Sequence, residues 1–124
     1  MKKKEGNCVV IDSISHLTVR HVGKVIVCGS HGGRAAAEYM LTYKPKAVVF
    51  NDAGVGKQRA GICALEILQP CGIPGVAVST RSARIGEGWD TYYCGEVSFV
   101  NGMARLKGIR RGMKVKAVVK RLAA

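Results

Sequence analysis

The fold of this chain is decided by three stretches of its sequence: residues 25–28 (Val-Ile-Val-Cys), 47–50 (Ala-Val-Val-Phe) and 75–78 (Gly-Val-Ala-Val). Each stretch is continuously apolar rather than alternating, which is typical of parallel strands buried on both faces. The residues between them, 34–43 and 60–68, have helical composition. This strand–helix–strand rhythm predicts an α/β domain with a mostly parallel sheet and right-handed crossovers.

The remaining elements follow from local patterns and turn residues. We expect strands at 8–12, 24–28, 46–50 and 75–78, glycine-containing loops at 29–33 and 51–59, and a turn or short helix at 18–23. In the last third we expect a helical turn at 87–94, a strand at 96–100, a turn at Asn101-Gly102, and a basic amphipathic helix, favoured over a strand, at 115–122.

The length of 124 residues predicts a single domain, 1–124, with a basic N-terminal tail (1–6) and a basic C-terminal segment (105–124). Hydrophobic residues make up 48% of the chain and aromatic residues only 6%, so the core should be aliphatic. A chain of this size buries a substantial core, about two-thirds of its unfolded surface.

The net charge of +12 is concentrated at the two ends of the chain. Residues 105–124 contain eight basic residues and no acid, and all eight acids lie between Glu5 and Glu96. Basic segments without interleaved aromatic residues suit loose attraction to polyanions. Polyanion binding by the basic ends is therefore an alternative function, but a solvated basic face explains the charge equally well, and we do not expect nucleic acid as a partner.

The five cysteines show neither a C-x-x-C pair nor zinc-finger spacing, so we expect no metal and a reducing, cytoplasmic location. Cys94 has no neighbouring base, which favours packing over a role as nucleophile. Asp12 stops the first apolar run after four residues, so we expect no membrane segment. No motif indicates a cofactor.

The strands end in polar residues at what should be one edge of the sheet, where parallel sheets bind ligands. After the 24–28 strand comes Gly29-Ser30-His31-Gly32-Gly33. We predict His31 as an acid–base catalyst and Ser30 as a hydrogen-bonding or nucleophilic group, while Gly32 and Gly33 open a helix start to a carboxylate or phosphate. The alternative is a tight turn with an exposed histidine.

Asn51-Asp52-Ala53-Gly54 follows the next strand. We predict that Asn51 holds an oxyanion or substrate amide and that Asp52 orients His31 or acts as a base; the alternative is an Asx-turn with capping. Residues 54–57 do not complete a phosphate-binding P-loop, which would need glycine at Asn51 and Ser or Thr at Gln58.

The segment after the 75–78 strand is dense in hydroxyls and charges. If it is extended, alternate residues such as Ser82 and Arg84 share one face, and Arg84 can clamp a carboxylate. The alternative is structural pairing of Arg84 with Glu87 or Asp90. We predict that this segment contributes five substrate-binding residues: Ser79, Ser82, Arg84, Asp90 and Thr91.

The segment from Gly23 to Gly86 resembles the swivelling domain that forms the small subunit of the aconitase-X and phosphomevalonate dehydratase family. The similarity lies in the Gly29-Ser30 turn, the strand that begins at Pro45, residues 61–65 (Gly-Ile-Cys-Ala-Leu) and residues 72–78 (Gly-Ile-Pro-Gly-Val-Ala-Val). It implies a swivelling β/β/α fold, a serine supplied to a dehydration site, and a large partner subunit carrying an iron–sulfur cluster. Ser30 is the one residue to which a role in the family is transferred. The family's turn is serine-rich, whereas here Ser30 is followed by His31-Gly32-Gly33, and residues 82–101 have no counterpart in the family. The Gly-Ser-His-Gly-Gly, Asn-Asp-Ala-Gly and Ser-Ala-Arg-Ile-Gly motifs also suggest a small bacterial family of its own.

Together these patterns predict a small three-layer α/β sandwich or a swivelling β/β/α-like domain. We predict an enzyme that acts on a small polar or carboxylate substrate by acid–base chemistry, of the hydro-lyase, isomerase or hydrolase type. A homo-oligomer is expected, because small enzymes often complete their sites between subunits. The alternative is a non-catalytic small subunit or ligand-binding module of a larger, dehydratase-like complex.

Overall fold

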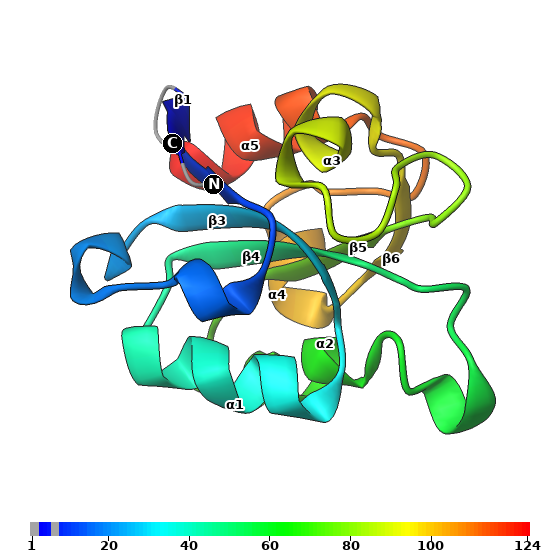
Figure 1. Cartoon of the computed structure of the whole chain (residues 1–124), viewed down its shortest axis with the longest axis horizontal. Coiled ribbons are helices and arrows are strands. Elements are labelled where there is room, and N and C mark those ends of the chain that lie inside the picture. The colour runs from blue at the N-terminus through cyan, green and yellow to red at the C-terminus, as the bar shows by residue number, and fades with distance from the viewer. Residues whose placement is uncertain (1–2, 6–7) are drawn as a thin grey trace.

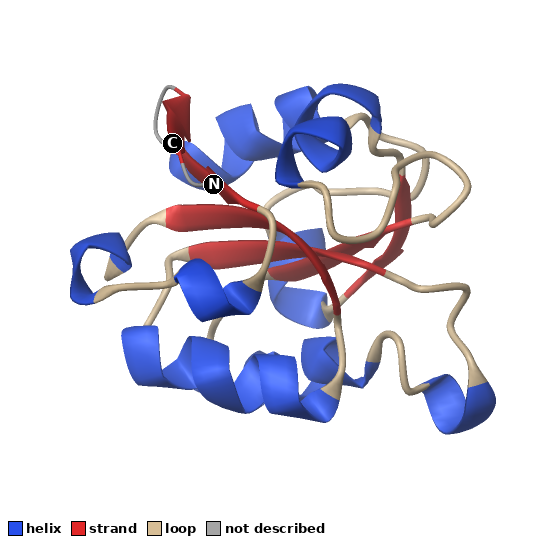
Figure 2. Cartoon of the chain, viewed as in Figure 1, coloured by secondary structure: helices blue, strands red, loops and turns tan. Residues whose placement is uncertain are grey.

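A computed structural model describes residues 3–5 and 8–124. The chain forms three layers, with a central sheet and helices on both of its faces (Figures 1 and 2). Of the two architectures expected, this is the three-layer α/β sandwich. The expected N-terminal tail lies partly outside the described residues, and its residues Lys3–Glu5 form a strand, β1, that pairs with β2.

The sheet has six strands in the order β1-β2-β3-β4-β5-β6. The central four are mutually parallel, and the two edge strands are antiparallel to their neighbours. Their bounds are β1 Lys3–Glu5, β2 Cys8–Ile11, β3 Val25–His31, β4 Ala47–Asn51, β5 Gly75–Val78 and β6 Val97–Val100. Because the strand order never reverses, the sheet has no switch-point crevice of the kind that doubly wound sheets use for ligands.

The helices are divided between the two faces according to this order. Successive right-handed crossovers in a sheet of sequential strands return on the same side, so α1 (Arg34–Tyr43) and α2 (Cys63–Leu68) pack on one face. The opposite face is covered by α3 (Gly88–Cys94) and α5 (Val115–Ala123), while α4 (Gly102–Leu106) follows β6. The described residues also contain four short 3-10 helices: η1 Ile14–His16, η2 Val19–His21, η3 Lys57–Arg59 and η4 Gln69–Cys71.

Two separate cores explain why the central strands are continuously apolar. In β3, Val25 and Val27 pack toward α3 and α5, whereas Ile26 and Cys28 pack toward α1 and α2. Successive side chains of a strand point to opposite faces, and here both faces are buried.

The observed elements differ from the predicted ones where long-range pairing decides the outcome. The helix at 34–43 and the strand at 75–78 have the predicted bounds. However, β3 continues through the predicted glycine loop to His31, because His31 pairs with Asn51 beyond a shift in register. The predicted turn at Asn101 begins α4, since the Asn101 side chain accepts a hydrogen bond from the Ala104 N–H at 3.0 Å.

Residues 79–88 cross the carboxyl ends of all four parallel strands, and we call this segment the strap. It leaves β5 at Ser79 and is then tied to each remaining strand in turn. The three ties are hydrogen bonds from Asn51 Nδ2 to the Ala83 carbonyl (2.9 Å), from the Gly86 N–H to the Gly29 carbonyl (2.7 Å), and from the Gly88 N–H to Asp12 Oδ1 (2.8 Å).

The strap crosses so closely that two glycines are required. A Cβ at Gly29 would stand 2.6 Å from the Gly86 carbonyl carbon and 2.7 Å from the Asp12 carbonyl oxygen. A Cβ at Gly88 would overlap the Ile11 carbonyl oxygen. These contacts are with backbone atoms, which cannot rotate away as a side chain could, so a larger residue would displace the strap.

Substitution Gly29→Ala should therefore lower the free energy of unfolding by about 3 kcal/mol, the cost of overpacking a fixed backbone contact. The matched control is Gly72→Ala, where φ is 74° but no atom lies within 4 Å of the new Cβ. That control should cost only about 1 kcal/mol, the strain of a left-handed alanine. Urea unfolding measures both, and equal losses would show that the strap is not packed against β3.

Candidate functional site

The turn between β3 and α1 is closely packed. The Ser30 Oγ accepts a hydrogen bond from the Ile14 N–H at 3.1 Å. The His31 side chain is exposed, and its ring lies against Gly33, with Nε2 2.8 Å from where a Cβ would stand. Among the described residues, no hydrogen bond joins His31 to Ser30 or to Asp52, so the structure does not assemble a catalytic triad.

Gly32 is held by backbone contacts on both sides of the turn. Its N–H lies 3.1 Å from the Asn51 carbonyl and 2.9 Å from the Gly61 carbonyl, and its own carbonyl accepts from the Ala64 N–H. A Cβ at Gly32 would stand 3.0 Å from the Gly61 carbonyl oxygen. Close packing therefore accounts for this glycine, and the predicted ligand-binding role of Gly32 and Gly33 stays a prediction.

The side chain of Asn51 is fully buried and satisfied. Its Nδ2 donates to the Ala83 carbonyl of the strap, and its Oδ1 accepts from the Ala53 N–H at 2.8 Å. The amide therefore joins the end of β4 to the strap and to its own turn.

Asp52 is 5% exposed, and both of its carboxylate oxygens are hydrogen-bonded. Oδ1 accepts from the Gly54 N–H at 2.8 Å and from the Thr80 N–H at 3.1 Å. Oδ2 accepts from the Ser98 hydroxyl at 2.8 Å. This is the Asx-turn alternative for Asp52, extended to the strap and β6, and it places Asp52 as a positioning residue for the strap.

The strap begins with a helical turn rather than an extended segment. The Ser79 carbonyl accepts from the Ser82 N–H at 3.0 Å, the Ala83 N–H at 3.2 Å and the Ser82 hydroxyl at 2.8 Å. The expected extended conformation is therefore wrong, because the hydroxyls of the segment bond to its own backbone and curl it, although Ser82 and Arg84 still line one space.

The turn encloses a hollow of about 320 Å³ at the end of β5, which we call the strand-end hollow. Three of the predicted site residues line it: Ser82, Arg84 and Asp90. The other lining residues are Thr80, Arg81, Ala83 and Ile85.

Two predicted binding residues of this segment lie outside the hollow's lining. Thr91 is buried and its hydroxyl donates to the Glu87 carbonyl at 2.9 Å, while Ser79 forms the turn. Arg81 was not among the predicted site residues. Its only signal in the sequence was its position in the same motif, and an extended segment would have pointed it away from Ser82 and Arg84.

The charged groups of the strand-end hollow are of both signs. Arg84 Nη1 lies 3.4 Å from Glu87 Oε2, and both side chains are largely exposed. The Arg84 N–H donates to Asp90 Oδ2 at 2.7 Å. Arg81 is exposed and forms no ion pair with any residue that the structure describes. It is therefore the guanidinium most open to a ligand.

The thiols near the sheet are not activated. Burial raises the pKa of the Cys28 thiol to about 12. A hydrogen bond to Asp90 raises the pKa of the exposed Cys94 thiol, which therefore stays protonated. Cys94 is exposed rather than packed, but it lacks the thiolate character of a nucleophile. Across residues 3–5 and 8–124, no cluster of three or more His, Cys, Asp or Glu side chains is arranged to hold a metal ion.

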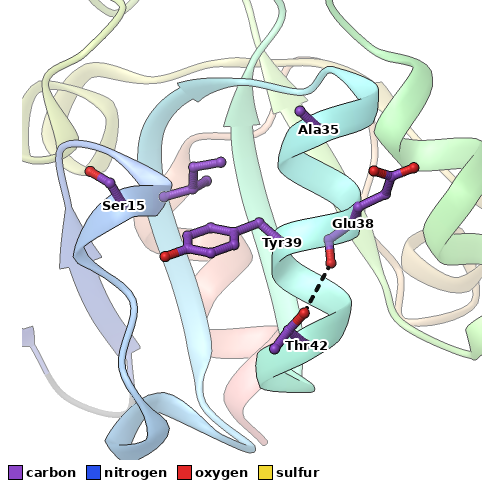
Figure 3. A pocket seen from close by; sticks show the side chains of 6 residues that line it. Ser15, Ala35, Glu38, Tyr39 and Thr42 are labelled. Carbon is purple, nitrogen blue, oxygen red and sulfur yellow. Dashed lines mark hydrogen bonds between the residues drawn. The ribbon is translucent and has the colours of Figure 1, made fainter.

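A second, larger hollow lies between η1 and α1 (Figure 3). Its volume is about 530 Å³, and Ile14, Ser15, Ala35, Glu38, Tyr39 and Thr42 line it. The Thr42 hydroxyl bonds to the Glu38 carbonyl, and the Glu38 carboxylate pairs with Arg34 at 3.4 Å. The lining is mainly carbon and contains none of the predicted site residues, so it does not share the chemistry of the strand-end hollow.

Comparisons of the chain with models of protein families, with curated proteins and with solved structures found no match. The resemblance to the dehydratase small subunit therefore stays a prediction. Within the described part of the chain, no helix combines the length and the apolar character needed to cross a bilayer.

Substitution Asp52→Ala should lower the free energy of unfolding by about 3 kcal/mol, because two N–H groups and a hydroxyl lose their acceptor in a buried place. Asp52→Asn keeps one carbonyl oxygen and should cost clearly less. Urea unfolding gives both values. If Asp52→Ala is neutral, Asp52 does not hold the strap.

A lowered pKa at Asp12 links the strap to acid stability. The Gly88 N–H bond lowers the pKa of the Asp12 carboxyl below its ordinary value. Such a group contributes stability above its unfolded-state pKa of about 4, and this contribution is lost as the pH falls through the folded-state value.

Substitution Asp12→Asn should therefore flatten the dependence of unfolding free energy on pH below about pH 4. Parallel urea titrations of the wild-type and variant proteins across the acid range measure the slope. An unchanged slope would show that Asp12 and Gly88 are not bonded in the folded protein.

Proposed function

We propose that this protein binds a small polar ligand carrying a carboxylate in the strand-end hollow. The observation that carries the proposal is the lining itself, in which Thr80, Arg81, Ser82, Arg84 and Asp90 surround one space of about 320 Å³. Arginine guanidinium groups match the geometry of a carboxylate and bind it with two parallel hydrogen bonds.

The strand ends support this site without entering it. Asn51 bonds to the Ala83 carbonyl and Asp52 to the Thr80 N–H, so each braces one side of the turn that forms the hollow. A site whose backbone is held in this way keeps its geometry in the absence of ligand, which reduces the entropy lost on binding.

The balance of charge narrows the ligand class. Arg81 and Arg84 are accompanied by the carboxylates of Glu87 and Asp90, so the site is close to neutral. A polyanion would gain little electrostatic binding free energy there. A ligand that combines one carboxylate with a hydroxyl or amine fits better, because Asp90 offers an acceptor for the second group.

Acid–base catalysis on such a ligand is a second candidate function, favoured by the exposure of His31 at the same edge of the sheet. Asn51 and Asp52 already use their side chains to brace the strap, so His31 is the exposed imidazole left at this edge, and histidine is the side chain most often used for general acid–base catalysis. Three expectations stay predictions from the sequence: the reaction type (hydro-lyase, isomerase or hydrolase), a homo-oligomer, and a larger partner subunit.

Substitution Arg81→Gln should weaken binding of a carboxylate about tenfold or more. The probes are acetate and glycolate, which adds a hydroxyl, titrated into isotope-labelled protein while the backbone amide signals of Arg81 and Ile85 are followed. Wild-type protein should show saturable shifts at these amides, with glycolate binding the more tightly.

Two further variants control for charge and for ion-pair loss. Arg84→Gln should weaken binding less, because Glu87 already engages its guanidinium at 3.4 Å. Arg34→Gln removes an equally long and even more exposed pair, with Glu38, from the opposite layer and should leave binding unchanged. Absence of saturable shifts in the wild-type protein, or equal weakening by Arg34→Gln, would refute the proposed site.

A further inference from the structure

A separate basic hollow lies at the opposite edge of the sheet from β1, beside β6. Its volume is about 450 Å³, and it shares no lining residue with the strand-end hollow. We call it the arginine hollow; its lining residues are Ser98, Phe99, Val100, Arg105, Ile109, Arg110 and Arg111. The chain between α4 and α5 closes it by running back along β6, with hydrogen bonds between Val97 and residues 112–113 (Figure 1).

The charge of the arginine hollow is not neutralised locally. Residues 97–124 contain no Asp or Glu. The preceding acid, Glu96, already pairs with Lys114 at 3.3 Å. Asp52 lies behind Ser98, but it is 5% exposed and its carboxylate is occupied by three hydrogen bonds. The three arginines therefore present an excess of positive charge to solvent.

Arg110 is tied to its own segment by hydrogen bonds from its guanidinium. Its Nη1 donates to the Arg105 carbonyl at 3.3 Å and to the Ile109 carbonyl at 3.2 Å, and its backbone N–H lies 3.1 Å from Met113 Sδ. These bonds use one edge of the guanidinium and leave its other N–H groups available. A preorganised guanidinium loses less entropy on binding an anion than a free side chain would.

The positive surface continues onto α5. The Arg121 guanidinium lies against Gly108, with Nη1 2.6 Å from where a Cβ would stand. Lys116, Lys120 and Arg121 are exposed on α5, while its apolar side packs on the sheet. A ligand longer than one anionic group can therefore reach Arg121 as well as the hollow.

The hollow also contains apolar surface. Phe99 is half-buried: it packs partly against the core on the α1 and α2 face and also lines the hollow, together with Val100 and the buried Ile109. An aromatic ring beside arginines is the combination that single-stranded nucleic acids meet in proteins, where bases stack on rings and guanidiniums bind phosphates. An acidic peptide would use the arginines but would have no need for the ring.

We propose that the arginine hollow binds single-stranded RNA, with a phosphate on Arg110 and a base against Phe99. This inference concerns a different site from the proposed carboxylate site and stands independently of it. It develops the alternative of polyanion binding by the basic C-terminal segment and differs from the expectation that nucleic acid is not a partner: no aromatic residue is interleaved with the basic ones in sequence, but the fold brings Phe99 beside them.

Fluorescence anisotropy with a labelled oligouridylate of about ten nucleotides tests the proposal on the full chain. Wild-type protein should bind with an affinity that falls steeply as salt rises. Arg110→Gln should weaken binding about tenfold and reduce the slope of log affinity against log salt by about one. The control Arg59→Gln removes one exposed arginine from η3 and should change neither quantity, because Arg59 lies outside the hollow.

Two further measurements distinguish RNA recognition from general attraction to polyanions. They use the Phe99→Leu variant and two other polyanions, heparin and polyglutamate. Phe99→Leu should weaken oligouridylate binding about tenfold while leaving heparin binding unchanged, because only a nucleic acid stacks on the ring. Equal effects of Arg110→Gln and Arg59→Gln would overturn the proposal, as would polyglutamate binding as tightly as RNA. If Phe99→Leu does not fold, the Arg110→Gln and Arg59→Gln comparison decides the result.

Discussion

The close passage of the strap over the strand ends constrains the rest of this structure. Backbone meets backbone at Gly29 and at Gly88 with no room for a Cβ. A crossing at that distance needs glycine on one side and a hydrogen-bond partner for each polar group it buries. The Gly29 carbonyl, the Asp12 carboxylate and the Asn51 amide supply those partners, one from each of three neighbouring strands.

Because of this constraint, polar residues at the strand ends bind the strap instead of lining an open edge of the sheet. In an open α/β sheet such residues face a ligand. Here Asn51 and Asp52 face the strap, and their buried hydrogen bonds are already complete. The side chains open to solvent at this edge therefore include those that the strap itself carries. Arg81 is the clearest example, because it is exposed and has no acidic partner among the described residues.

Much of the fold could be predicted from the sequence because its signals are local. The apolar runs at 47–50 and 75–78 identify buried strands, and Pro45 marks the end of α1 as expected. What could not be predicted depends on contacts between distant residues. His31 joins β3 because it pairs with Asn51, and the strap curls because the Ser79 carbonyl collects hydrogen bonds from Ser82 and Ala83.

The residues of the two hollows also divide into those with a local signal in the sequence and those brought together by distant contacts. Ser82, Arg84 and Asp90 could be found from the density of polar groups in one motif, but the place of Arg81 beside them required the turn. The arginine hollow could not be found from spacing at all, since it needs β6 to lie against the segment that follows α4. The chain thus presents a near-neutral hollow on the strap and a basic hollow at the sheet edge.

Native-state hydrogen exchange at the Gly86 and Gly88 amides tests the central role of the strap most directly. The Gly86 N–H donates to Gly29 on β3 at 2.7 Å, and the Gly88 N–H donates to Asp12, directly after β2, at 2.8 Å. If the strap is fixed across the sheet, these amides should exchange nearly as slowly as those of β3 and β4, through global unfolding. Exchange at the rate of an exposed loop, while β3 and β4 remain protected, would contradict the account.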